Sequence, residues 1–314
     1  MIQRTVIGIV GVGNVGRAAA YALFNQRLAS EIILVDLDHA RAEGEAMDLM
    51  HGQILVGSTR VRAGSYEDLA DAQVIVITAG ASQQSPDESR LELLERNAAI
   101  FDQIVAELDT HAPESLLVVA TNPVDVLTYV TQLRSERPSQ MVIGTGTLLD
   151  TARFRALLGA HYNVDPRSVH AYILGEHGDS EVPIWSNANI GGQMIRTHEV
   201  LGRRFHADAM QQLFERARDA AYEIIERKGH TDSAIGVVIA RIIRSVLGDE
   251  KSVLPVSTRT EGRYGLADVC LSIPCVVGNR GVEAQIMPEL SVTERKGLEQ
   301  SAAVLRSSLH DLGL

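Results

Sequence analysis

Residues 5–36 read TVIGIVGVGNVGRAAAYALFNQRLASEIILVD, and this stretch decides the fold class. An almost wholly apolar run at 5–10 leads directly into GVGNVG at 11–16, a helical pattern occupies 15–27, and a second apolar run ends at Asp36. Short runs that are apolar on both faces are typical of strands in a parallel sheet covered by helices. The order strand, glycine turn, helix, strand therefore predicts the first βαβ unit of a dinucleotide-binding fold.

Three glycines and one carboxylate in this unit predict the cofactor. Gly11 permits the tight turn, Gly13 lets the backbone approach a pyrophosphate, and Gly16 lets the helix pack closely on the strand. The helix N-terminus adds N–H groups and the positive end of the helix dipole. Asp36 ends the second strand, where a carboxylate accepts hydrogen bonds from ribose hydroxyls and repels the extra phosphate of NADP. We therefore expect NAD.

Strand and helix patterns continue to alternate beyond this unit. Further apolar runs occur at 73–78, 115–120 and 141–143, and helical patterns occur at 40–50 and 90–109. The first half is therefore predicted to be an α/β domain with a doubly wound parallel sheet, a Rossmann domain over residues 1–145. The second half, 146–314, is predicted to be a mixed α/β substrate domain. Its expected strands lie near 168–174, 182–185 and 269–277, and its expected helices near 148–158, 203–227, 231–247 and 292–309.

Composition excludes several classes of protein. The net charge of −11 and the isoelectric point near 5.4 disfavour binding to nucleic acid or to anionic lipid. No apolar run approaches the roughly 20 residues of a membrane span, and the first ten residues are too short for a secretory signal, so we expect a cytoplasmic protein. Cys270 and Cys275 lie in an apolar stretch without a CxxC pattern. They predict buried free thiols and no metal site.

A second constellation predicts acid–base chemistry. In GEHGDSEVPIW (175–185), His177 lies in a glycine-flanked polar loop, and its pKa range suits a group that exchanges a proton with an alcohol or ketone. Asp150 is the candidate carboxylate partner that would hold the histidine protonated. Arg153 follows Asp150 by three residues on a predicted helix, so both can lie on one face. Its planar guanidinium suits a two-pronged grip on a substrate carboxylate. Each feature alone is also compatible with a structural role.

Taken in order, seven motifs resemble the lactate/malate dehydrogenase family over nearly the whole chain: GVGNVG, IILVD, ITAGA, ESRLELLERN, ATNPVD, TLLDTARFR and GEHGDSEVPIW. The resemblance implies that His177 donates and accepts the proton, that Asp150 is its partner, and that Arg153 binds the substrate carboxylate. It also implies that Arg90 polarises the substrate carbonyl. These roles are chemically consistent, because a ketone that becomes an alkoxide needs positive charge beside its oxygen.

The resemblance assigns roles to two further residues. Asn122 would position both substrate and cofactor, and its place before Pro123 at a strand end suits a tight turn with a cis peptide. Thr231, in KGHTDSAIG, resembles the family residue that lines the pocket for the substrate side chain.

The loop at 82–89, SQQSPDES, predicts the substrate. The second carboxylate of malate would need a cation in a buried site, and this loop contains no Lys or Arg. Glutamine is the residue that the family uses for lactate at the specificity position. Gln84 fits the spacing to Arg90 and Gln83 fits the spacing from the AGA motif, so the loop contains one extra residue. Pyruvate, reduced to L-lactate, is the expected substrate, and a bulkier 2-oxoacid is an alternative.

Three other functions remain open from the sequence. Malate dehydrogenase has the same chemistry but does not suit the uncharged glutamines. The NAD-dependent glycosidases share the fold and use a metal held by Cys and His, which the positions of the two cysteines do not suggest. A catalytically silent NAD-binding protein would have no need for the His, Asp and Arg set.

The resemblance also implies regulation and assembly. In many bacterial members, residues that match Arg155 and His170 bind fructose 1,6-bisphosphate across a twofold subunit interface, and such enzymes are usually homotetramers. Repetition of two basic residues from two subunits would concentrate positive charge where phosphates can bridge them. We therefore expect a homo-oligomer with a possible bisphosphate activator. An exposed arginine and a packed histidine without a ligand are the alternative.

Overall fold

The computed structural model describes residues 4–81, 90–260 and 262–314. Their largest feature is a nine-stranded sheet in the order β12-β11-β10-β6-β5-β4-β1-β2-β3. Six of its strands are parallel to one another, and they are β1 (Val6–Val10), β2 (Glu31–Val35), β3 (Arg60–Ala63), β4 (Val74–Ile77), β5 (Leu116–Val119) and β6 (Val142–Gly144). The chain leaves β1 in one direction to form β2 and β3, and in the other to form β4, β5 and β6. This order confirms the predicted doubly wound sheet.

Three antiparallel strands from the second half extend the same sheet. They are β10 (Ser252–Arg259), β11 (Cys270–Gly278) and β12 (Gly281–Gln285). The junction is narrow, because β10 meets β6 only where Ser257 pairs with Gly144. A separate antiparallel sheet contains β7 (Val169–Leu174), β8 (Val182–Ile190) and β9 (Gln193–Met194).

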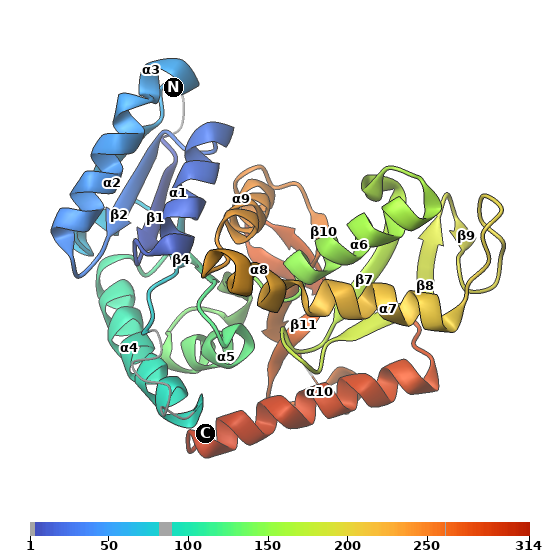
Figure 1. Cartoon of the computed structure of the whole chain (residues 1–314). Coiled ribbons are helices and arrows are strands. Elements are labelled where there is room, and N and C mark those ends of the chain that lie inside the picture. Colours follow the sequence, from blue (N-terminus) through green and yellow to red (C-terminus); the bar gives the residue numbers. More distant parts are fainter. Residues whose placement is uncertain (1–3, 82–89, 261) are drawn as a thin grey trace.

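Helices cover both sheets, as Figure 1 shows. In the first half they are α1 (Asn14–Gln26), α2 (His39–His51), α3 (Gln53–Val56), α4 (Arg90–His111) and α5 (Val124–Arg134). In the second half they are α6 (Leu148–Tyr162), α7 (Ala207–Arg218), α8 (Ala220–Lys228), α9 (Ser233–Leu247) and α10 (Val292–Asp311). The long α10 runs beneath the molecule in Figure 1 and contacts both β8 and α5. It therefore joins the two halves of the chain.

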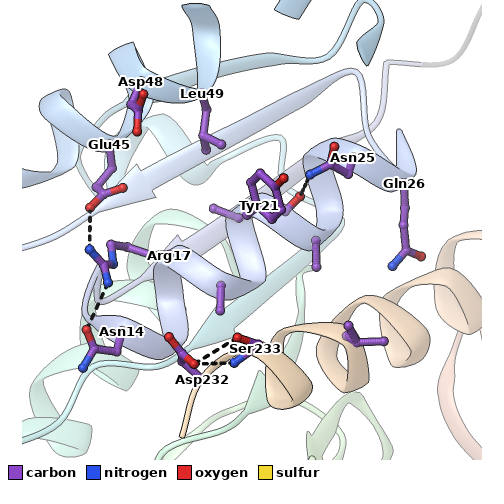
Figure 2. A pocket seen from close by; sticks show the side chains of 14 residues that line it. Asn14, Arg17, Tyr21, Asn25, Gln26, Glu45, Asp48, Leu49, Asp232 and Ser233 are labelled. Carbon is purple, nitrogen blue, oxygen red and sulfur yellow. Dashed lines mark hydrogen bonds and ion pairs between the residues drawn. The ribbon is translucent and has the colours of Figure 1, made fainter. Parts of the chain in front are cut away.

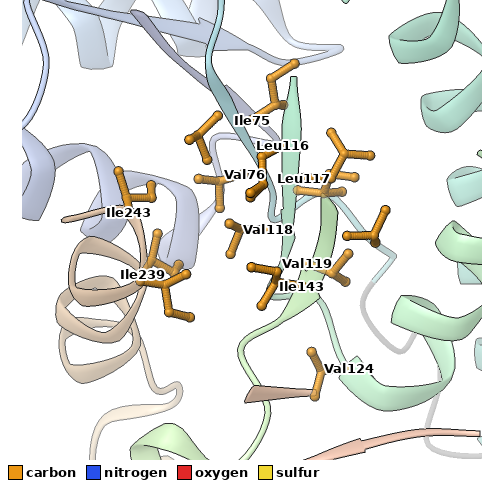
Figure 3. Packing of buried hydrophobic residues seen from close by; sticks show 14 of the residues in the cluster. Ile75, Val76, Leu116, Leu117, Val118, Val119, Val124, Ile143, Ile239 and Ile243 are labelled. Carbon is orange, nitrogen blue, oxygen red and sulfur yellow. The ribbon is translucent and has the colours of Figure 1, made fainter. Parts of the chain in front are cut away.

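The main core lies between the parallel strands and the helices that cover them. Figure 3 shows Ile75, Leu117 and Val118 on the central strands, with Ile239 and Ile243 of α9 facing them. Burying each such side chain stabilises the fold by about 1.5–3 kcal/mol. Because α9 belongs to the second half of the chain, this packing fixes the position of the second half relative to the parallel strands.

Four strands have no counterpart in the sequence-based prediction, and they are β3, β9, β10 and β12. β3 reads RVRA and lies at the sheet edge, where only Val61 is buried, so no apolar run marks it. β10 reads SVLPVSTR, and its internal proline weakens the strand pattern. The helical stretch expected at 203–227 is two helices, α7 and α8, which meet at Asp219.

Candidate active site

The glycine turn after β1 has the geometry that a dinucleotide needs. Gly11 has φ +96°, and a Cβ there would lie 2.3 Å from the backbone nitrogen of Ala79, so only glycine fits. By contrast, a Cβ on Gly13 would meet no described protein atom within 4 Å. Space is therefore open directly before the N-terminus of α1, where N–H groups can face a phosphate.

Asp36 is held beside this turn. Its Oδ2 accepts a hydrogen bond from the Val12 backbone N–H at 2.5 Å, and its Oδ1 accepts one from the Asp38 N–H at 2.9 Å. The side chain remains partly exposed. A fixed carboxylate that still faces solvent, next to an open glycine turn, fits the ribose and pyrophosphate of NAD.

Asp150 joins the two other predicted catalytic side chains. Its Oδ2 lies 2.6 Å from Nδ1 of His177, and its Oδ1 accepts a hydrogen bond from Nη1 of Arg153 at 2.9 Å. Asp150 and Arg153 lie in the first turns of α6, and His177 lies in the loop between β7 and β8. Residues 27 positions apart in the sequence therefore meet in one cluster.

Electrostatics keeps the His177–Asp150 pair ionised. Burial alone would lower the pKa of His177, but the Asp150 carboxylate and its hydrogen bond raise it to about 9. Burial of Asp150, which is 2% exposed, opposes its ionisation, yet the charges of His177 and Arg153 hold its pKa below the ordinary value. His177 is therefore protonated at neutral pH, and Nε2 is the ring nitrogen left for a substrate.

A pocket of about 240 Å³ lies over this cluster. Asn122, Arg153 and His177 line it, together with Glu181, Arg218 and residues of α8. The Asn122–Pro123 peptide bond is cis, as the sequence suggested. Thr231 is partly buried in the segment between α8 and α9, and it is not among the residues that line this pocket.

Sequence reasoning missed Asp125, which supports the catalytic loop. This residue is 2% exposed, and its Oδ2 accepts a hydrogen bond from the His177 backbone N–H at 2.7 Å while its Oδ1 accepts one from Ser257 at 2.5 Å. Burial raises the pKa of Asp125 to about 6, although both hydrogen bonds favour the charged form. Its motif, ATNPVD, contained the residue, but no local signal marked it as a partner of a loop 52 positions away.

Several predicted residues lie outside the described part of the chain or apart from the pocket. Gln83 and Gln84 fall outside the described residues, and Arg90 begins α4 with its side chain also outside the description. Arg155 donates from Nε to the Ala171 carbonyl at 2.8 Å and lies over the Tyr172 ring. His170 is exposed on β7, next to that carbonyl.

The cysteines and the one group of described acidic and histidine side chains that lie close together are in different parts of the fold. Among the described residues, the group close enough to share an ion consists of Asp150, His177 and Glu181. Cys270 and Cys275 are buried free thiols, as predicted, and belong to no such group in the described chain. Within the same residues, no helix has both the length and the apolarity that crossing a bilayer requires.

A larger pocket of about 580 Å³ lies along α1, between α2 and the start of α9. Figure 2 shows Arg17 in its wall, near Glu45 and Asn14, with Tyr21 further along α1. None of the predicted site residues lines it. The cluster around His177, rather than this larger pocket, contains the groups that can carry out chemistry.

Comparisons with known proteins identify the family of the chain. The profile of the lactate/malate dehydrogenase NAD binding domain matches residues 5–144, and that of the lactate/malate dehydrogenase alpha/beta C-terminal domain matches residues 147–312. An L-lactate dehydrogenase of Salinibacter ruber is 68% identical over 312 residues, covering 99% of both chains, and one of Synechococcus sp. is 46% identical over 97% of this chain and 98% of the relative.

Solved structures give the same result. A minor L-lactate dehydrogenase from Enterococcus mundtii has a TM-score of 0.95 at 41% identity, covering 98% of each chain. MGS-M5, a lactate dehydrogenase from a deep-sea metagenome library, has a TM-score of 0.94 at 40% identity, covering 100% of each chain. With its glycine turn, Asp36 and the His177 cluster, the chain belongs to the lactate/malate dehydrogenase family and uses NAD as its cofactor.

Proposed function

We propose that this chain reduces pyruvate to L-lactate with NADH and catalyses the reverse reaction with NAD. The observation that carries the proposal is the convergence of Arg153 and His177 on one pocket, with Asp150 bonded to both. An anion-binding group and a proton donor that are bonded to the same carboxylate and line the same pocket suit a small 2-oxoacid. The 68% identity to an L-lactate dehydrogenase supports the choice of lactate within the family.

In the proposed reaction, Arg153 binds the substrate carboxylate with the N–H groups that Asp150 does not occupy. His177 donates a hydrogen bond from Nε2 to the ketone oxygen, and Arg90 adds positive charge at the same oxygen. NADH, which the glycine turn and Asp36 would hold, would supply the hydride for the carbonyl carbon. His177 gives its proton to the oxygen, so that pyruvate, hydride and proton together yield lactate, and Asp150 holds the imidazole in place throughout.

Pocket charges favour a monocarboxylate over malate. Arg218 lines the pocket but donates to both oxygens of Asp219, from Nε at 2.7 Å and from Nη2 at 3.2 Å. Its charge is therefore already paired, and a second substrate carboxylate would lack a free cation among the described lining residues. We propose that Gln83 or Gln84 faces the substrate methyl group and that Asn122 contacts both substrate and cofactor. Thr231, which does not line the described pocket, is proposed to approach the substrate side chain from the segment between α8 and α9.

We also propose a division into residues 1–145, which bind NAD, and 146–314, which carry most of the substrate site.

For assembly, we propose a homo-oligomer, a tetramer by analogy with the family. Exposed apolar side chains on the N-terminal helices support a contact there, since Met47 is 62% exposed, Ile54 93% and Leu55 85%. Arg155 and His170 are the proposed site for fructose 1,6-bisphosphate.

The test is a steady-state comparison of pyruvate, oxaloacetate and branched 2-oxoacids with NADH, in the presence of EDTA. The highest kcat/KM for pyruvate is the expected result. Preference for oxaloacetate would assign malate, preference for a branched acid would assign a bulkier substrate, and loss of all activity in EDTA would favour metal-dependent chemistry. As a control, His177→Asn should lose turnover while NADH still binds, because the side chain serves proton transfer rather than the cofactor.

A further inference from the structure

Glu181 is a buried carboxyl group in the substrate pocket to which the proposed reaction assigns no task. It follows His177 by four residues and immediately precedes β8, in a turn where its backbone N–H donates to the Gly178 carbonyl at 3.2 Å. The residue is 6% exposed. Its Oε1 is fully buried and has no hydrogen-bond partner among the described residues.

The neighbours of Glu181 leave its charge uncompensated. One side-chain atom from each of Glu181, Asp150 and His177 lies within 4.8 Å of the other two. Both oxygens of Asp150 are occupied, by His177 and by Arg153. A second carboxylate at this distance in a buried site would repel the first, and burial already disfavours the ionised form.

The other charged groups around the pocket relieve only part of this repulsion. From α6, Arg153 is bonded to Asp150, and from α7, Arg218 is paired with Asp219. In the catalytic loop, exposed Asp179 is itself negative and accepts a hydrogen bond from Tyr222 of α8 at 3.0 Å. Burial, followed by the Asp150 charge, raises the pKa of Glu181 far above its ordinary value, although His177, Arg153 and Arg218 act in the opposite direction.

We propose that Glu181 is a neutral carboxylic acid in the substrate-binding form of the enzyme, and that its ionisation at alkaline pH weakens binding of the anionic substrate. The part that concerns substrate rests on the proposed function. With Glu181 neutral, Asp150, Arg153 and protonated His177 sum to one positive charge, which matches a monocarboxylate. Ionised Glu181 brings that sum to zero and adds a negative charge beside the substrate site.

Infrared spectroscopy of the free protein tests the protonation state without any catalysis. We expect the C=O stretching band of a protonated carboxyl group at about pH 8, absent from Glu181→Gln and lost from the wild type as the pH rises further. Asp125 also has a raised pKa, about 6, and is largely ionised at that pH. Identical spectra for wild type and Glu181→Gln in the carboxylic acid region would overturn the proposal.

The pH dependence of the pyruvate KM tests the consequence for binding. In the wild type, loss of protons from both His177 and Glu181 should raise KM at alkaline pH. In Glu181→Gln only His177 can titrate, and its pKa should be lower because the Glu181 charge that helps to raise it is gone. The two proteins are therefore compared at equal protonated fractions of His177, followed in each by NMR of the ring, and the ratio of wild-type KM to Glu181→Gln KM should grow by up to about tenfold per pH unit once Glu181 ionises. A chelator belongs in every assay, because Asp150, His177 and Glu181 could hold a contaminating metal ion together.

Two further variants make this experiment decisive. Asp179→Asn removes one negative charge from an exposed residue of the same loop that also lines the pocket. It can therefore change KM, but its KM ratio to wild type should stay constant across the alkaline range. Glu181→Asp retains an ionisable group and should restore the additional alkaline rise in KM. Parallel curves for wild type and Glu181→Gln would refute the role in binding. If pyruvate proves not to be a substrate, the proposed function fails, and the infrared result still decides whether Glu181 is neutral.

Discussion

Oδ2 of Asp150 lies 2.6 Å from Nδ1 of His177, and this contact determines which ring nitrogen can serve the substrate. Because Nδ1 is bonded to a buried carboxylate, Nε2 is the free position, and the imidazolium form is favoured. The same carboxylate holds Arg153 through its other oxygen. One side chain thus positions both the proposed proton donor and the proposed anion-binding group.

Asp150→Asn should impair pyruvate reduction in a pH-dependent way. An amide can still hold the ring but no longer supplies the charge that raises the pKa of His177 to about 9, so that pKa should fall. The protonated fraction then declines at a lower pH, and kcat/KM at about pH 8 should drop at least ~10-fold, with a smaller loss in acid. The pH profile of kcat/KM measures this. Asp102→Asn, an exposed change on α4, is the control. Equal losses at every pH would contradict this account.

Arg153→Lys should raise the pyruvate KM by about 10–100-fold, the equivalent of one lost charge-assisted hydrogen bond. Lysine keeps the charge but cannot bond to both Asp150 and a substrate carboxylate with planar N–H pairs. NADH titration by fluorescence should show an unchanged dissociation constant. A wild-type KM in this variant would place the carboxylate site elsewhere.

Asp36→Asn should narrow the preference for NAD over NADP. The carboxylate that repels the extra phosphate is gone, while the amide oxygen can still accept the bond from the Val12 N–H. Asp36→Ser should have the same effect on cofactor choice but also lower stability by about 1–3 kcal/mol, because the shorter side chain leaves that N–H unsatisfied. Cofactor ratios and thermal unfolding separate the two effects. If the ratio of kcat/KM for NADP to that for NAD is unaltered in both variants, Asp36 does not select the cofactor.

Two separate variants, Gln83→Arg and Gln84→Arg, should show which of these two residues faces the substrate. Only the residue that faces the substrate side chain can pair with the second carboxylate of oxaloacetate, so one variant alone should gain oxaloacetate reduction. The measurement is the ratio of kcat/KM for oxaloacetate and pyruvate. No gain in either variant would mean that another residue reads the substrate.

Fructose 1,6-bisphosphate should lower the pyruvate KM if the Arg155 and His170 region binds it. His170→Ala is the cleaner variant, because His170 is exposed whereas Arg155 also bonds to the Ala171 carbonyl and contacts Tyr172. For the wild type, pyruvate saturation curves measured with and without the bisphosphate at mildly acidic and neutral pH should differ. For the double variant that combines Arg155→Gln and His170→Ala, the two curves should coincide. Curves that superimpose for wild type would reject activation, and an effect that survives in the double variant would reject this site.

The nucleotide turn shows which features of the structure can be predicted from local sequence patterns. Gly11 and Asp36 could be assigned because a strand, a tight turn and a helix follow one another within about one βαβ unit, and each step has a characteristic pattern. The edge strand Arg60–Ala63 could not be predicted in the same way, because an edge strand buries few side chains and therefore carries no apolar run.

Motif order in the sequence thus determined the doubly wound fold and the NAD cofactor, and it led to the prediction of His177, Asp150 and Arg153 as site residues. Only the tertiary structure decided that α9 and β10–β12 of the second half pack against the parallel strands, and that Asp125 holds the His177 loop. It also decided that Glu181 lies beside Asp150, with one oxygen that has no hydrogen-bond partner among the described residues. The physical reason is the distance along the sequence over which each effect acts. Backbone conformation and amphipathic pattern act over a few residues, whereas the charge of a buried side chain depends on which distant groups packing brings within a few ångströms of it.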